Sequence, residues 1–137
     1  MELIDDIQYF YIFFHNKIET KWWNIFLDEN FCHCSVVEKK TYGNINVYIE
    51  MANFDNLIKS DVYFGEWGDE IFTKILKLKN VTCLEYKTKI TGNKKFISFF
   101  KINCVTFVKK VIEINNYFVF TPKQLYNYLL KKGAMKI

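Results

Sequence analysis

The sequence is poor in the residues that interrupt regular structure. Its 137 residues include one proline, five glycines and no arginine. No apolar run approaches the ~18 residues that would suggest a membrane-spanning helix. The opening residues, Met1–Asp6, are acidic where a secretory signal would be basic. The sequence therefore predicts a single domain over residues 1–137, with no secretory signal and no membrane span.

Cysteine is also sparse, with four residues and no regular spacing. This usage favours reduced thiols in a cytoplasm over a disulfide framework. Cys32 and Cys34 flank His33 in a predicted strand, so the two thiols share one face and the imidazole takes the other. That geometry argues against a zinc site built from the three, and small core hydrophobes are the simpler interpretation of the two cysteines. No cofactor or metal is expected.

The formal net charge of +4 comes from lysines spread along the chain. Aromatic residues reach 19%, but Asn, Ile, Lys, Phe and Tyr are abundant together, which is typical of an AT-rich genome. Solvated lysines and core aromatics explain these features more simply than a nucleic-acid interface does. A nucleic-acid partner is therefore the weaker interpretation.

Apolar patterning predicts an antiparallel arrangement of strands in the first half. Residues 7–14 are dense in β-formers and predict a strand buried on both faces, with His15 at its end facing solvent. Residues 31–37 predict the His33 strand. Residues 44–51 alternate and predict its hairpin partner. Cross-strand neighbours lie about 5 Å apart, so either Asn46 or Glu50 could orient the imidazole of His33.

The remaining segments carry weaker signals. Residues 21–27 predict a short helix over the core, and residues 53–69 predict a loop with little regular structure. Residues 71–79 suit either a helix or a strand, and the alternation favours a strand. Residues 81–90 predict a further strand.

Two helices are predicted near the C-terminus. Asn103 is a good N-cap, and Val105, Val108 and Ile112 recur at helical spacing, which places Cys104 in a first helical turn where a thiolate is favoured. His33 is the predicted base for this nucleophile. In residues 121–124, Thr-Pro-Lys-Gln forms a capping box that predicts a helix over 122–132.

Together these segments resemble a known group. The run 31–37, the strand ending in Ile49-Glu50, the run 103–110 and the run 121–126 are similar to the circularly permuted papain-like branch of the NlpC/P60 superfamily. Trp22-Trp23 before the histidine strand resembles small tailed-phage proteins of that group. Asn103-Cys104 with Phe107 partly matches the Asn-Cys-Glu-His-Phe motif of lecithin:retinol acyltransferase-like enzymes. Val and Thr stand where those enzymes carry Glu and His, so the resemblance does not extend to their lipid chemistry.

The resemblance implies an α+β fold in which an antiparallel sheet is followed by a helix bearing Cys104 and a C-terminal helix. It implies Cys104 as nucleophile, His33 as base, and Glu50 or Asn46 as the third residue. The implied activity is that of a cysteine hydrolase or acyltransferase of phage origin, acting on a peptide or acyl substrate in the infected host cell or with the virion. The alternative is a non-catalytic module of the same fold that binds virion or host proteins.

Overall fold

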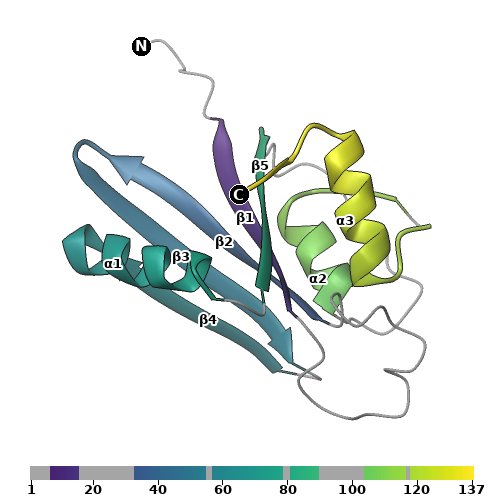
Figure 1. Cartoon of the computed structure of the whole chain (residues 1–137), viewed down its shortest axis with the longest axis horizontal. Coiled ribbons are helices and arrows are strands. Elements are labelled where there is room, and N and C mark those ends of the chain that lie inside the picture. The colour runs from purple at the N-terminus through teal and green to yellow at the C-terminus, as the bar shows by residue number, and fades with distance from the viewer. Residues whose placement is uncertain (1–6, 16–32, 55–56, 79–80, 90–103, 117) are drawn as a thin grey trace.

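The computed structural model describes residues 7–15, 33–54, 57–78, 81–89, 104–116 and 118–137. They form an α+β fold with a six-stranded antiparallel sheet and three helices (Figure 1). The strands are β1 (Gln8–His15), β2 (His33–Tyr42), β3 (Ile45–Phe54), β4 (Leu57–Phe64), β5 (Val81–Thr88) and β6 (Met135–Lys136). The helices are α1 (Gly65–Leu76), α2 (Cys104–Val111) and α3 (Pro122–Lys131).

The strand order is β4-β3-β2-β1-β5-β6, so β1 lies inside the sheet between β2 and β5. The predicted strand over 7–14 is confirmed, and both of its faces are buried because hydrophobic clusters cover the sheet on both sides. The predicted hairpin of the His33 strand with the next strand is also confirmed. Its turn includes Gly43 at φ 60, a left-handed conformation that glycine adopts without a steric penalty.

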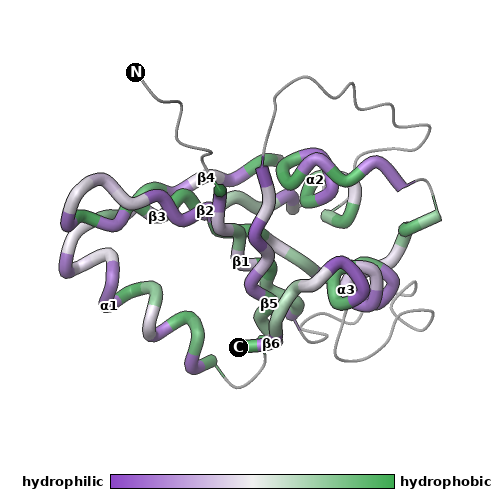
Figure 2. Tube along the Cα trace, turned by 90° about the horizontal axis from the view of Figure 1, so that it is seen from above, coloured by the Kyte–Doolittle hydropathy of each residue, from purple (hydrophilic) through white to green (hydrophobic). Residues whose placement is uncertain are grey.

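Helix α1 lies on one side of the sheet and helices α2 and α3 lie on the other (Figure 2), and each side of the sheet has its own hydrophobic core. On one face, Phe10, Ile12 and Phe14 of β1 pack in a cluster with residues of α2 and α3. On the other face, Tyr11 and Phe13 pack with residues of α1 and β4. Because successive strand side chains point to opposite faces, the uninterrupted apolar run of β1 supplies both cores at once.

The region after β3 differs from its prediction. Residues 57–64 form β4 and residues 65–76 form α1, where the sequence predicted a loop over 53–69 and a strand over 71–79. The helix is stabilised by tertiary packing, since the ring of Phe72 lies 4.8 Å from Tyr11 and 4.6 Å from Tyr48. The alternation that favoured a strand there was misleading because Lys77 is the exposed C-cap residue directly after the helix, and Lys79 lies outside the described residues.

The other predicted elements are found where expected. The strand over 81–90 appears as β5, the Cys104 helix as α2 and the 122–132 helix as α3. The Thr121 hydroxyl accepts a hydrogen bond from the Gln124 backbone N–H, and the Gln124 side-chain oxygen accepts one from the Thr121 backbone N–H, which completes the predicted capping box. The predicted helix over 21–27, the Trp22-Trp23 pair, Cys32 and the Asn103 cap lie outside the described residues.

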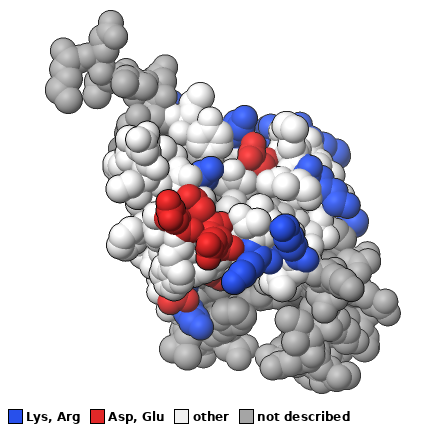
Figure 3. Space-filling view, turned by 60° about the vertical axis from the view of Figure 1, so that its left-hand side comes forward, with Lys and Arg blue, Asp and Glu red and all other residues white. Residues whose placement is uncertain are grey.

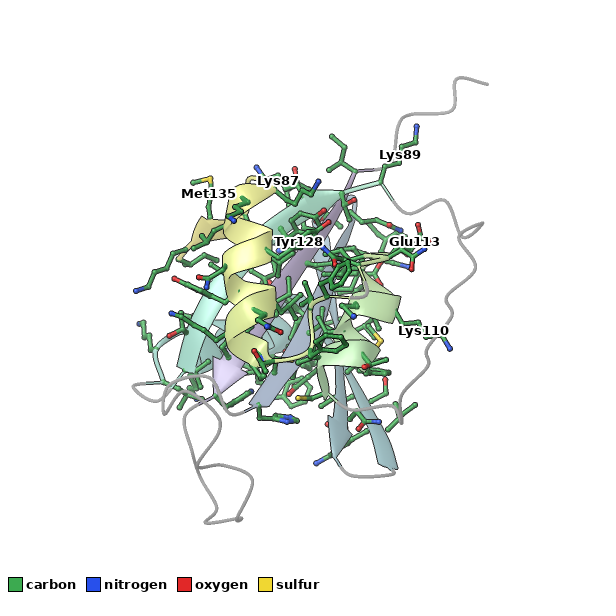
Figure 4. The ribbon with its side chains drawn as sticks, turned by 90° about the vertical axis from the view of Figure 1, so that its right-hand side faces the viewer. Lys87, Lys89, Lys110, Glu113, Tyr128 and Met135 are labelled. Atoms are coloured by element: carbon green, nitrogen blue, oxygen red, sulfur yellow. The ribbon has the colours of Figure 1, made fainter. Side chains whose placement is uncertain are left out.

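Helices α2 and α3 lie side by side over the sheet (Figure 4). Tyr128 of α3, labelled in that view, packs against the core that they share with β1. None of the helices that the structure describes is both long and apolar enough to cross a membrane.

Candidate active site

Cys104 is the first residue of α2 and is partly buried against the core cluster that contains Cys34. Helix α2 packs across β2 and β3, so its first turn lies over strand residues far away in the sequence. The early backbone N–H groups of a helix have no intrahelical acceptor, and they favour negative charge at this end. A thiol placed there is poised to ionise.

Two residues of β2, His33 and Cys34, interact with the Cys104 thiol. The Cys34 thiol gives the largest contribution, the His33 imidazole contributes by hydrogen bond and by charge, and the backbone of Cys34 adds a further hydrogen bond. These interactions outweigh the burial that would oppose ionisation, and the pKa of Cys104 is held well below its ordinary value. The predicted pair of Cys104 and His33 is therefore brought together in the structure.

The pKa of the Cys34 thiol is shifted in the opposite direction. The Cys34 side chain is fully buried, and both this burial and its hydrogen bond to Cys104 raise the pKa of the Cys34 thiol. Cys34 thus stays protonated and acts as the S–H donor to the Cys104 thiolate. The sequence placed Cys34 among core hydrophobes, which is correct for its burial. Its hydrogen bond to Cys104 depends on the packing of α2 on β2 and was not predicted.

His15 belongs to the same cluster. It pairs with His33 across β1 and β2, with 5.6 Å between the ring centroids, and its Nε2 shares a 3.1 Å hydrogen bond with the Ser35 hydroxyl. Burial, with a smaller contribution from His33, lowers the pKa of His15 to about 4. His15 closes β1 as predicted, but its side chain is half-buried and does not face solvent, because His33 and Ser35 of β2 lie beside its ring.

Glu50 and Asn46 do not reach the site. Glu50 lies opposite Val37, four residues along β2 from His33, a separation of about 13 Å at the usual strand rise. Its carboxylate is instead next to Asp61 and Lys59, and burial followed by the charge of Asp61 raises its pKa. The expectation that Glu50 orients His33 is therefore not supported by the register.

Asn46 lies still farther from the site. It is opposite Thr41, eight residues along β2 from His33 and about 26 Å away. Its amide donates to Asp69, and that carboxylate also accepts a hydrogen bond of 2.5 Å from Tyr48. These bonds tie α1 to β3 and explain why Asn46 is oriented toward α1.

The charged side chains are distributed over the surface. On the face shown in Figure 3, lysines lie in several separate places with acidic side chains between them. Within the described ranges, no three His, Cys, Asp or Glu side chains are grouped closely enough to hold a metal ion. The cluster of Cys104, His33 and Cys34 supports the chemistry of a nucleophilic thiolate beside an imidazole.

No family model, curated protein or solved structure matches this chain. The permuted papain-like assignment therefore stays a prediction.

Proposed function

We propose that this protein is a cysteine-dependent acyl hydrolase or acyltransferase of the permuted papain-like type. The observation that carries the proposal is the contact of Cys104, at the start of α2, with both His33 and Cys34. A nucleophile and base within hydrogen-bonding reach, with the nucleophile at a helix N-terminus, are the minimum that such chemistry needs.

In the proposed reaction, the Cys104 thiolate attacks the carbonyl carbon of an amide or ester. The carbonyl π electrons move to oxygen, and backbone N–H groups at the start of α2 stabilise that oxyanion. Collapse of the tetrahedral intermediate breaks the bond to the leaving group, which takes a proton from the His33 imidazolium. A thioester remains on Cys104.

His33 then takes a proton from the incoming acceptor, which attacks the thioester and regenerates the thiolate. Water as acceptor gives a hydrolase, and an amine or alcohol gives a transferase. We place the substrate among peptides or acyl compounds, and the site of action in a phage-infected cell or with the virion, on the strength of the sequence resemblance alone.

The test is the pH dependence of Cys104 alkylation by iodoacetamide, followed by peptide mass spectrometry. The same peptide in urea-unfolded protein is the reference. We expect the folded thiol to label at lower pH than the unfolded one, and His33→Ala to move the profile upward. Glu50→Gln is the matched control and leaves the profile unchanged, because Glu50 is about 13 Å from His33 along the sheet.

A second measurement separates an enzyme from a binding module of the same fold. Incubation with p-nitrophenyl acetate produces an acetyl thioester on Cys104 and continued nitrophenol release if the site turns over. An alkylation profile equal to that of the unfolded chain, or one unaffected by His33→Ala, would falsify the catalytic proposal. Stoichiometric acetylation without turnover would favour the non-catalytic alternative.

A further inference from the structure

Among the described strands, β4 is one of the two edges of the sheet, and residues 58–62 of it are exposed. Ile58 and Val62 are 61% and 59% exposed, and Lys59 and Asp61 are exposed between them. An edge strand presents unpaired backbone N–H and C=O groups that can pair with another strand. Apolar side chains on such an edge make association more favourable.

The face of β4 toward α1 contains an unfavourable pair of like charges. Glu50 of β3 lies directly opposite Asp61 of β4, and burial, followed by the charge of Asp61, raises the pKa of Glu50. Like charges directly opposite on neighbouring strands are destabilising. Lys59 lessens this repulsion from one side, and a second cation on the open side of Asp61 would lessen it further.

A second copy of the chain supplies that cation if the β4 strands of the two copies pair with each other. In an antiparallel pair related by a two-fold axis normal to the sheet, opposite residues share a face, so their numbers sum to an even value. With Ser60 on the axis, Lys59 of each copy lies opposite Asp61 of the other. Moving the axis to residue 59 sets lysine against lysine, and moving it to residue 61 sets aspartate against aspartate.

We infer that β4 is a homodimerisation strand that pairs with β4 of a second copy about Ser60, joining two six-stranded sheets. Two Lys59–Asp61 pairs form on one face, and two Ile58–Val62 pairs form on the other. An edge lysine can also serve to prevent association. Here, however, Asp61 of the second copy lies opposite Lys59 across the axis. A lysine that served only to repel other strands would not need an aspartate at that position.

A charge exchange tests this register. We expect sedimentation equilibrium over a concentration series to show a reversible dimer of the full chain. Lys59→Asp and Asp61→Lys each place like charges opposite one another at two positions and weaken the dimer roughly tenfold or more. The double variant Lys59→Asp/Asp61→Lys restores dimerisation, because each new pair is again of opposite charge.

Lys136→Asp is the matched control, since Lys136 is an exposed lysine on the opposite edge strand, β6. We expect it to leave the dimer intact, and thermal denaturation to show that each variant folds. A protein that stays monomeric at all concentrations, or a dimer that the double variant fails to restore, overturns the inference. Equal weakening by Lys136→Asp also overturns it, because the effect would then reflect net charge.

Discussion

Replacing Cys34 by Ala probes how the thiolate at position 104 is stabilised. The Cys34 thiol is the largest single influence lowering the pKa of Cys104, and it is fully buried. A hydrogen bond to a charged group contributes about 1.5–3 kcal/mol, and S–H is a weak donor, so we take the lower end. A loss of about 1.4 kcal/mol lowers the ratio of thiolate to thiol at a fixed acidic pH roughly tenfold.

The alkylation profile of Cys104 gives two readouts. At acidic pH the thiolate fraction of Cys34→Ala is roughly tenfold lower, but each thiolate is roughly threefold more reactive, so the labelling rate falls roughly threefold relative to the native protein. At high pH the rate rises roughly threefold, since thiolate nucleophilicity increases with pKa with a Brønsted coefficient of about 0.4–0.5. The two changes are opposite in sign, which distinguishes a change in ionisation from a change in access.

Cys83→Ala is the control. Cys83 is a buried cysteine in the other core, where burial and then the charge of Glu85 raise its pKa to about 12. We expect its removal to leave the Cys104 profile unchanged. If Cys34→Ala instead increased labelling equally at every pH, the substitution would have opened access only. The S–H donor would then play no part in stabilising the thiolate.

Three further predictions concern stability, measured by urea denaturation. The folded protein keeps His15 neutral down to about pH 4, whereas the unfolded chain protonates it near pH 6.5. The contribution of neutral His15 to the free energy of unfolding is therefore fully present above pH 6.5 and falls by up to about 3 kcal/mol on acidification to pH 4. His15→Gln removes that part of the pH dependence, and an unchanged slope would contradict its origin in His15. Lys109→Met costs about 2–4 kcal/mol, because Nζ of the buried Lys109 donates to two backbone carbonyls at 2.9 Å, whereas Lys110→Met at the exposed neighbour costs little. Gly68→Ala costs about 1–3 kcal/mol, because the added Cβ would lie 3.1 Å from a backbone carbon of β4; a gain in stability would show that α1 moves away freely.

Local sequence patterns predicted the elements whose signals lie within a few residues. The capping box at Thr121 and Gln124 satisfies helix N–H groups inside one turn, so α3 needs no distant partner to be recognised. The apolar run of β1 is recognisable for a similar reason, because burial on both faces removes the alternation of a surface strand. Helix α1 was missed because its apolar stripe is short and is completed only by contact with Tyr11 and Tyr48.

For the candidate site too, local sequence patterns predicted some features and not others. Residue type and helix position were sufficient to select Cys104 as a nucleophile, and the order of elements was sufficient to pair it with His33. Strand register decided the rest. The β1–β2 pairing brings His15 beside His33, whereas the β2–β3 pairing carries Asn46 to the far end of the hairpin. The packing of α2 on β2 then sets Cys34 against Cys104.

The sequence by itself thus determined which segments become strands and helices over most of the described chain, and which thiol can ionise most readily. These properties depend on side-chain periodicity, capping and the partial charge of a helix end, all of which act over a few residues. Only the tertiary structure decided which groups surround that thiol and which strand lies at the open edge. Both depend on contacts between segments distant in the sequence, whose register is selected by the burial of two opposite sheet faces.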